Sequence, residues 1–266
     1  MKISDLIFSF QQSLLIEKNL SASYVKDIIY VALLLERSSE STSIKGYNTE
    51  KVSAFLCQMR KERIWSAKTL LNYRQSLKTF FEFAKKKGYI KINPINGIEK
   101  PRLPKRLPRC LTKKQVKRLV SEVHIQSWRT FIEHQRNVAL IYTFLYTGVR
   151  LSELLNLKVH EVNFEEFSIF VNKGKGGKDR YVPLHPKLSP ILKNYIKSKR
   201  RKALVSNYLF SSHRSEKSLT KKNIYAIFKK LSIACDFHIT PHMLRHTMAK
   251  LSLESDLNIF KLKQIL

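Results

Sequence analysis

Apolar side chains recur every three or four residues through the first ninety positions, which is the spacing of amphipathic helices. Polar breaks separate four such runs, and these predict helices over residues 3–15, 24–35, 52–59 and 66–87. Ser21 or Ser23 is a candidate N-cap for the second run, and the lysines before Gly88 are typical of a helix end. The pattern predicts a small helical bundle.

The composition changes between Asn93 and Arg109, where four prolines alternate with basic residues. Prolines stiffen and extend a linker, and the positive charges would let it follow a phosphate backbone. A plain interdomain linker explains the prolines equally well, whereas the basic residues favour contact with DNA. We expect a helical domain over residues 1–92, a Pro-rich basic linker over 93–109 and a second domain over 110–266. The candidate DNA contacts in the linker are Lys100, Arg102, Lys105 and Arg106.

The second domain contains both the three-to-four-residue spacing of helices and the two-residue alternation of strands. Apolar spacing and capping residues predict helices over residues 112–123, 131–146, 188–203 and 220–231, further helices beginning near Arg150 and Thr240, and a last one over 257–266 capped by Asp256. Alternation at Phe167, Ile169 and Val171, and again at Tyr181 and Val182, predicts a β-hairpin with a lysine-glycine tip at 173–178. The expected fold class is mainly α with a small β-sheet (α+β).

The net charge of the chain narrows the classes of partner that it is expected to bind. The chain has 50 Lys and Arg against 20 Asp and Glu, giving a formal net charge of +30 and a pI near 10.1. A solvated basic surface is one explanation, but such a field attracts polyanions, and nucleic acid is the expected partner. No run of about 20 apolar residues and no signal peptide are found, so no membrane association is expected. Three dispersed cysteines suggest a reducing, cytoplasmic location.

Three sites carry candidate chemistry: Arg150, the lysine-glycine tip, and the cluster His242, Arg245 and His246. Residues three or four apart on a helix share a face, so the cluster can converge on a phosphate. Taken singly, Arg150 fits a surface ion pair, and the tip lysines fit a solvated loop. A P-loop is excluded because Asp179 follows Lys178. The two histidines could form a metal pair, but no carboxylate lies between them and Arg245 would repel a cation, so no metal is expected.

Taken together, three segments resemble the tyrosine recombinase family, which includes phage integrases and bacterial Xer proteins, and the Xer branch is the most similar. They are Thr-Gly-Val-Arg-Leu-Ser-Glu-Leu (147–154), Asn-Lys-Gly-Lys-Gly-Gly-Lys-Asp-Arg-Tyr-Val-Pro-Leu (172–184) and Thr-Pro-His-Met-Leu-Arg-His-Thr (240–247). The resemblance implies a helical core-binding bundle, a basic linker and a mixed catalytic domain.

The resemblance also implies roles for individual residues. Arg150 and Arg245 would hold the scissile phosphate, Lys175 would protonate the leaving 5′ oxygen, and His242 would donate or accept a proton near the nucleophile. Lys173 is the nearest competitor of Lys175. No metal or cofactor is implied. Further DNA contacts are expected at Lys173, Lys178, Arg180 and His246.

The implied function is site-specific DNA recombination through a 3′-phosphotyrosyl intermediate, with a tetramer acting on two duplexes that carry a specific recombination site. Location in a bacterial cytoplasm, associated with the nucleoid, is expected. The family also has a further His or Trp and then a nucleophilic tyrosine, but no tyrosine follows Tyr225 here. We therefore expect a C-terminally truncated recombinase without a nucleophile. The alternative is a catalytically inactive DNA-binding protein that occupies recombination sites.

Overall fold

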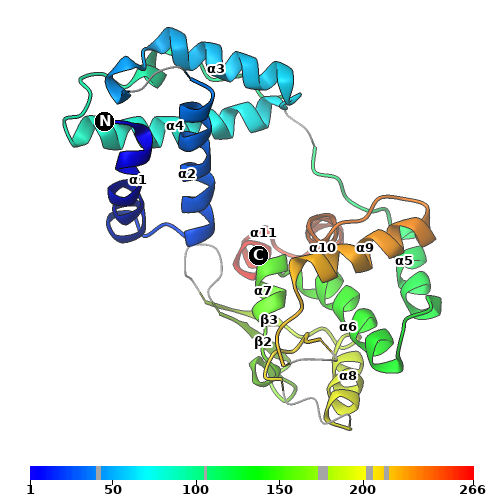
Figure 1. Cartoon of the computed structure of the whole chain (residues 1–266). Coiled ribbons are helices and arrows are strands. Elements are labelled where there is room, and N and C mark those ends of the chain that lie inside the picture. Colours follow the sequence, from blue (N-terminus) through cyan, green and yellow to red (C-terminus); the bar gives the residue numbers. More distant parts are fainter. Residues whose placement is uncertain (40–42, 105–106, 173–178, 202–205, 213–215) are drawn as a thin grey trace. The chain divides into compact units, whose positions relative to one another are not determined.

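The computed structural model describes residues 1–39, 43–104, 107–172, 179–201, 206–212 and 216–266 (Figure 1). The chain divides into two compact units, Met1–Arg106 and Leu107–Leu266, each with its own hydrophobic core. Both units are mainly helical, and the second contains a small antiparallel sheet. The predicted fold class is confirmed. No helix within the described ranges is long and apolar enough to cross a membrane.

The first unit is a helical bundle closed around aromatic side chains. Its helices are α1 (Ile3–Gln12), α2 (Ala22–Arg37), α3 (Thr49–Glu62) and α4 (Ala67–Lys86), with a π-helical turn at Ser13–Glu17 and 3-10 turns at Ile44–Gly46 and Pro94–Gly97. The ring of Phe10 on α1 lies 5.1 Å from the rings of both Phe80 and Phe83 on α4. Side-chain caps at Ser21 and Ser66 begin α2 and α4. The sequence located these helices, but the first one becomes a π turn after Gln12.

The second unit is built around a central helix. Its helices are α5 (Lys113–Ile125), α6 (Phe131–Thr147), α7 (Leu151–Asn156), α8 (Ser189–Arg201), α9 (Lys221–Cys235), α10 (Pro241–Glu254) and α11 (Ile259–Ile265), with a 3-10 turn at Val159–Glu161. Helix α6 packs against α5, α8 and α10, which explains why it is apolar on most of its circumference. Helix α11 lies against β3 and α10.

The sheet has the order β1-β2-β3, with strands β1 (Val162–Asn163), β2 (Ser168–Val171) and β3 (Arg180–Pro183). Ile169 pairs with Val162 on one side and Val182 on the other, and all three are buried. The predicted hairpin is therefore present, and its tip at 173–178 lies outside the described residues. Phe167 was wrongly assigned to the first strand: it has φ +49° and is exposed in the turn before β2.

The predicted cap of the last helix is also wrong. Asp256 has φ +59°, in the left-handed region, and lies in the turn after α10. Asn258 caps α11 instead, since its Oδ1 accepts a hydrogen bond of 2.8 Å from the backbone N–H of Phe260. Both residue types are good caps, and backbone geometry selects between them.

Candidate active site

Arg150 occupies the tight junction between α6 and α7. Helix α6 ends at Gly148, which has φ +61° and whose N–H donates to the Phe144 carbonyl. Arg150 is the N-cap residue of α7, and Glu153, three residues later, accepts a 2.7 Å hydrogen bond from the Arg150 backbone N–H. This capping arrangement fixes both side chains at the start of a helix.

Arg245 reaches the same junction from α10. Thr240 caps this helix by accepting from the Met243 N–H, and Pro241 occupies its first position. Nη1 of Arg245 donates to the carbonyl of Gly148, 97 positions earlier in the chain. His242 lies one turn before His246 on α10, and their rings meet edge to face at 4.3 Å.

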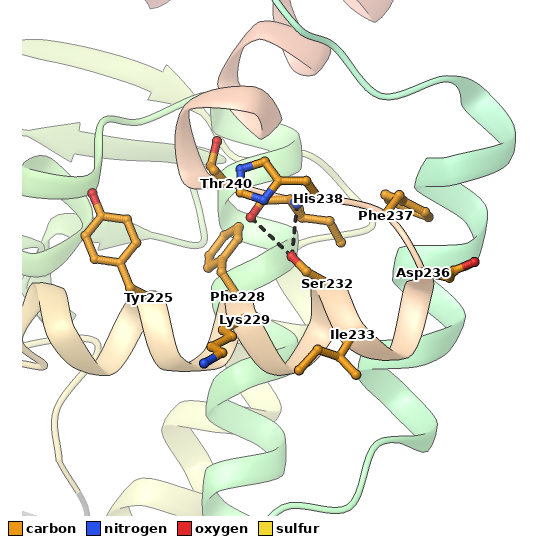
Figure 2. Close-up of a pocket in the computed structure, with 10 residues that line it drawn as sticks. Tyr225, Phe228, Lys229, Ser232, Ile233, Asp236, Phe237, His238 and Thr240 are labelled. Atoms are coloured by element: carbon orange, nitrogen blue, oxygen red, sulfur yellow. Dashed lines mark hydrogen bonds between the residues drawn. The ribbon is translucent and has the colours of Figure 1, made fainter. Parts of the chain in front are cut away.

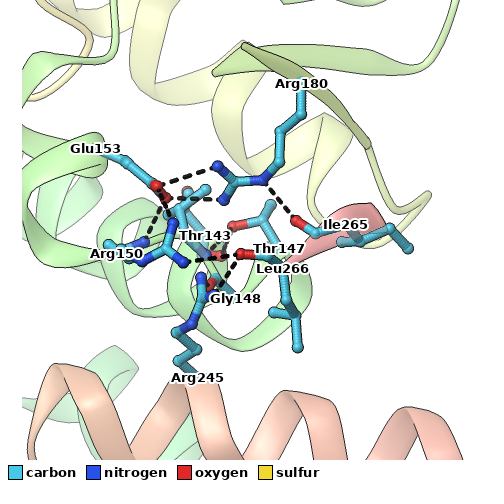
Figure 3. Close-up of polar contacts among 10 residues, drawn as sticks. Thr143, Thr147, Gly148, Arg150, Glu153, Arg180, Arg245, Ile265 and Leu266 are labelled. Atoms are coloured by element: carbon cyan, nitrogen blue, oxygen red, sulfur yellow. Dashed lines mark hydrogen bonds and ion pairs between the residues drawn. The ribbon is translucent and has the colours of Figure 1, made fainter. Parts of the chain in front are cut away.

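The two arginines converge on a single oxygen acceptor (Figure 3). Nη2 of Arg150 lies 3.2 Å from a backbone oxygen of Leu266, and Nη2 of Arg245 donates to the same atom. Burial, and then the positive charge of Arg150, lower the pKa of Arg245 to about 10, so it remains a cation at neutral pH. Two guanidiniums that share one acceptor form a site for an anionic oxygen.

Glu153 is a further member of the site that the sequence reasoning missed. Each of its carboxylate oxygens accepts two bonds: Oε1 from Nη1 of Arg150 (2.6 Å) and Nη1 of Arg180 (3.0 Å), and Oε2 from the Arg150 N–H (2.7 Å) and Nη2 of Arg180 (2.8 Å). Burial alone would raise the pKa of Glu153, but hydrogen bonds from Arg180 and Arg150 outweigh it and hold that pKa at about 2. The Arg-x-x-Glu spacing at a helix start was the signal available in the sequence.

Arg150, His242 and Arg245 line one cavity of about 520 Å³, together with Lys221 and Tyr225 of α9. Residues from two of the three motifs thus face a common space. A second cavity of about 580 Å³ runs along α9 and also includes Tyr225 (Figure 2). Beyond Phe228 along α9, Ser232 Oγ accepts a 3.0 Å bond from the Ile239 N–H, which holds the segment between α9 and α10 against α9.

The remaining predicted site residues fall into three groups. His246 is half-buried beside His242, and its pKa is lowered by burial and then by His242 and Arg245. Lys100 and Arg102 are exposed in the first unit, outside regular structure. Five candidates lie outside the described residues: Lys105, Arg106, Lys173, Lys175 and Lys178. In the part of the chain that is described, no group of three or more His, Cys, Asp or Glu side chains is arranged to hold a metal ion.

The variant Gly148→Ala tests how much the tight junction between α6 and α7 contributes to stability. A Cβ at this residue would lie 2.9 Å from Leu266 Cδ2 and 3.1 Å from Met248 Sδ, in addition to the left-handed strain. We expect a loss of about 1–3 kcal/mol in unfolding free energy, measured by urea denaturation. Gly88→Ala is the matched control, because Gly88 has φ +77° but open space around it. Equal losses in both variants would show that the neighbours of Gly148 move aside at no cost.

Comparison with known proteins identifies the family. A model described as the phage integrase family matches residues 109–266, and one described as the phage integrase N-terminal SAM-like domain matches residues 7–96. The chain therefore belongs to the phage integrase family of tyrosine recombinases, as its motifs predicted, and this is a family of site-specific DNA recombination.

Individual Xer proteins are similar over most of the chain. Tyrosine recombinase XerA of Pyrococcus furiosus is 33% identical over 227 residues, covering 84% of this chain and 73% of the relative. Tyrosine recombinase XerD of Listeria innocua is 27% identical over 274 residues, covering 99% and 90%. Among solved structures, XerH bound to a palindromic difH substrate in a post-cleavage complex has a TM-score of 0.79 at 20% identity, covering all of this chain and 77% of XerH. A lambda integrase tetramer bound to a Holliday junction gives 0.77 at 16%, with the same coverages. Both likenesses support the fold.

Proposed function

We propose that this protein binds duplex DNA at a specific recombination site and holds the scissile phosphate between Arg150 and Arg245. The observation that carries the proposal is the convergence of these two guanidiniums on one acceptor oxygen in a member of a recombinase family. In the complex with DNA, a non-bridging phosphate oxygen takes the place of the Leu266 oxygen. Charge that develops on the phosphate during strand transfer is then stabilised by donors already in position.

The other roles follow the motif positions. His242 lines the same cavity as the two arginines and serves as a proton donor or acceptor near the attacking hydroxyl. Lys175, in the β2–β3 connection, protonates the departing 5′ oxygen, with Lys173 as the competing candidate. Basic residues at Lys100, Arg102, Lys105, Arg106, Lys178 and His246 add DNA contacts. These assignments require no metal or cofactor.

The partner we propose is double-stranded DNA, bound by a tetramer on two duplexes. The net charge of +30 supports strong attraction to phosphate backbones. XerH is described on a difH substrate, and lambda integrase as a tetramer on a Holliday junction. We infer an equivalent assembly for this chain.

A second candidate function is occupation of recombination sites without cleavage. It is favoured by one observation: no tyrosine follows Tyr225 in these 266 residues. A phosphotyrosyl intermediate needs a nucleophile within reach of its activating groups. Cutting and rejoining therefore needs either Tyr225 of the shared cavity or a tyrosine supplied from outside these 266 residues, whereas binding needs neither.

The two functions separate in one experiment. The 266-residue protein selects duplexes from a random pool, and these are then offered to it with a nick at successive positions. We expect sequence-preferring binding whose affinity falls linearly on a log–log plot against salt, and no adduct that survives denaturing electrophoresis. Binding without sequence preference would refute the recombination-site proposal. A covalent adduct would refute site occupation alone, and its loss in Tyr225→Phe would identify the cavity tyrosine as its source.

A further inference from the structure

Arg180 has all three parts of its guanidinium engaged within the protein (Figure 3). Nη1 and Nη2 donate to the two oxygens of Glu153 at 3.0 and 2.8 Å, and Nε donates to the backbone oxygen of Ile265 at 2.6 Å. Its side chain is only 13% exposed. A guanidinium with this set of partners is poorly placed to grip a DNA backbone directly.

The charges of Arg150, Glu153, Arg180 and Arg245 indicate another role for Arg180, which is to offset the carboxylate charge of Glu153. The side chain of Glu153 is 3% exposed and forms a 2.6 Å ion pair with Nη1 of Arg150. With Glu153 as its sole neighbour, the positive charge of Arg150 would be largely cancelled. Arg180 supplies a second cation to the same carboxylate. Arg150, Arg180 and Arg245 against Glu153 leave a net charge of +2 facing the shared acceptor.

The hydrogen bonds of Arg180 also orient the Glu153 carboxylate and, through it, the Arg150 side chain. The fork of Arg180 takes one acceptor position on each oxygen of Glu153, so the carboxylate is held by two bonds that lie side by side. Arg150 bonds the remaining positions with Nη1 and its backbone N–H, and this leaves Nη2 pointing at the shared acceptor. Rotation of the carboxylate would break bonds to both arginines.

Arg180 also forms a hydrogen bond with the end of α11. Its Nε holds the carbonyl of Ile265, the residue next to the Leu266 oxygen that Arg150 and Arg245 share. Because Arg180 opens strand β3, one side chain joins the sheet, the start of α7 and the end of α11.

We propose that Arg180 is a positioning residue that acts through Glu153: it offsets the negative charge of that carboxylate, so that the positive charge of Arg150 is not cancelled, and it aims Nη2 of Arg150 at a phosphate oxygen. This inference rests on the proposed phosphate site. It replaces direct DNA contact as the role we assign to Arg180.

The test uses the 266-residue protein and inorganic phosphate as the probe. Side-chain Nε–H signals of Arg150 and Arg245 are assigned in ¹H–¹⁵N spectra with Arg150→Lys and Arg245→Lys, and then followed during a phosphate titration. In Arg180→Gln we expect phosphate binding at these signals to weaken at least about tenfold, since the charge of Arg180 and its two hydrogen bonds to Glu153 are lost. Arg180→Lys keeps the charge without the fork and should fall between Gln and the parent. Arg200→Gln, on the exposed end of α8, is the control for net charge and should match the parent.

A second readout reports on the carboxylate itself. The ¹³C signal of Glu153 is titrated, and its pKa of about 2 should rise clearly in Arg180→Gln and less in Arg180→Lys. If Arg180→Gln does not fold, Arg180→Lys carries both measurements. An unchanged Glu153 pKa together with unchanged phosphate binding overturns the inference. Absence of any phosphate response at Arg150 and Arg245 in the parent protein instead overturns the proposed phosphate site.

Discussion

The rate of strand cleavage is expected to be about a hundredfold or more lower in Arg245→Ala than in the parent protein. Both proteins are assayed with the same source of the tyrosine nucleophile. Arg245 donates to the same acceptor as Arg150, so its loss removes one of the two arginines of the proposed phosphate site. DNA affinity should change far less, because the other basic residues of a chain with a net charge of +30 supply most of the attraction.

The measurement is single-turnover cleavage of a nicked duplex beside a gel-shift titration of the same duplex. Arg245→Lys keeps the charge but loses the two-pronged donor, and should recover only part of the rate. Arg200→Ala on the exposed end of α8 is the matched control and should cleave like the parent. Parallel losses of binding and cleavage in Arg245→Ala would contradict the assignment of this side chain to the reacting phosphate.

The longer helices of both units could be predicted because they bury apolar residues at helical spacing, whereas α11 buries only Leu262. The stop of α6 was equally readable, since Gly148 adopts the left-handed conformation that such a stop requires. Turns were harder. Phe167 is apolar and follows the alternation of β2, but the chain reverses there with a positive φ that no glycine signalled.

The candidate site was predictable in part. Arg150 and Arg245 were singled out from motif spacing, and the structure brings them to one acceptor. The pairing of Arg180 with Glu153 was not predictable, because it depends on β3 being placed against the start of α7, 27 positions away. An arginine in a basic segment favours a DNA contact by composition alone. Only the fold shows that its donors face inward.

Glu153→Gln is expected to destabilise the second unit by roughly 3–5 kcal/mol, the usual cost of removing one partner from a buried ion pair. Glutamine keeps the shape but leaves Arg150, Arg180 and Arg245 close together without a counter-charge. The matched control is Glu161→Gln. Glu161 is also buried and caps its own turn with a 2.7 Å bond from the Lys158 N–H, but it forms no ion pair with an arginine among the described residues. Its loss should cost about 1 kcal/mol.

The pH dependence of unfolding gives an independent check on the same carboxylate. The folded pKa of Glu153 is about 2, below its ordinary value of 4.5, so its contribution is complete above about pH 4.5 and is lost as the pH falls towards 2. That difference corresponds to about 3 kcal/mol, in line with the expected cost of the substitution. Urea denaturation between pH 2.5 and 6 should therefore show a shallower acid decline in Glu153→Gln than in the parent or in Glu161→Gln. Identical acid slopes in all three proteins would mean that the two arginines do not hold Glu153 ionised.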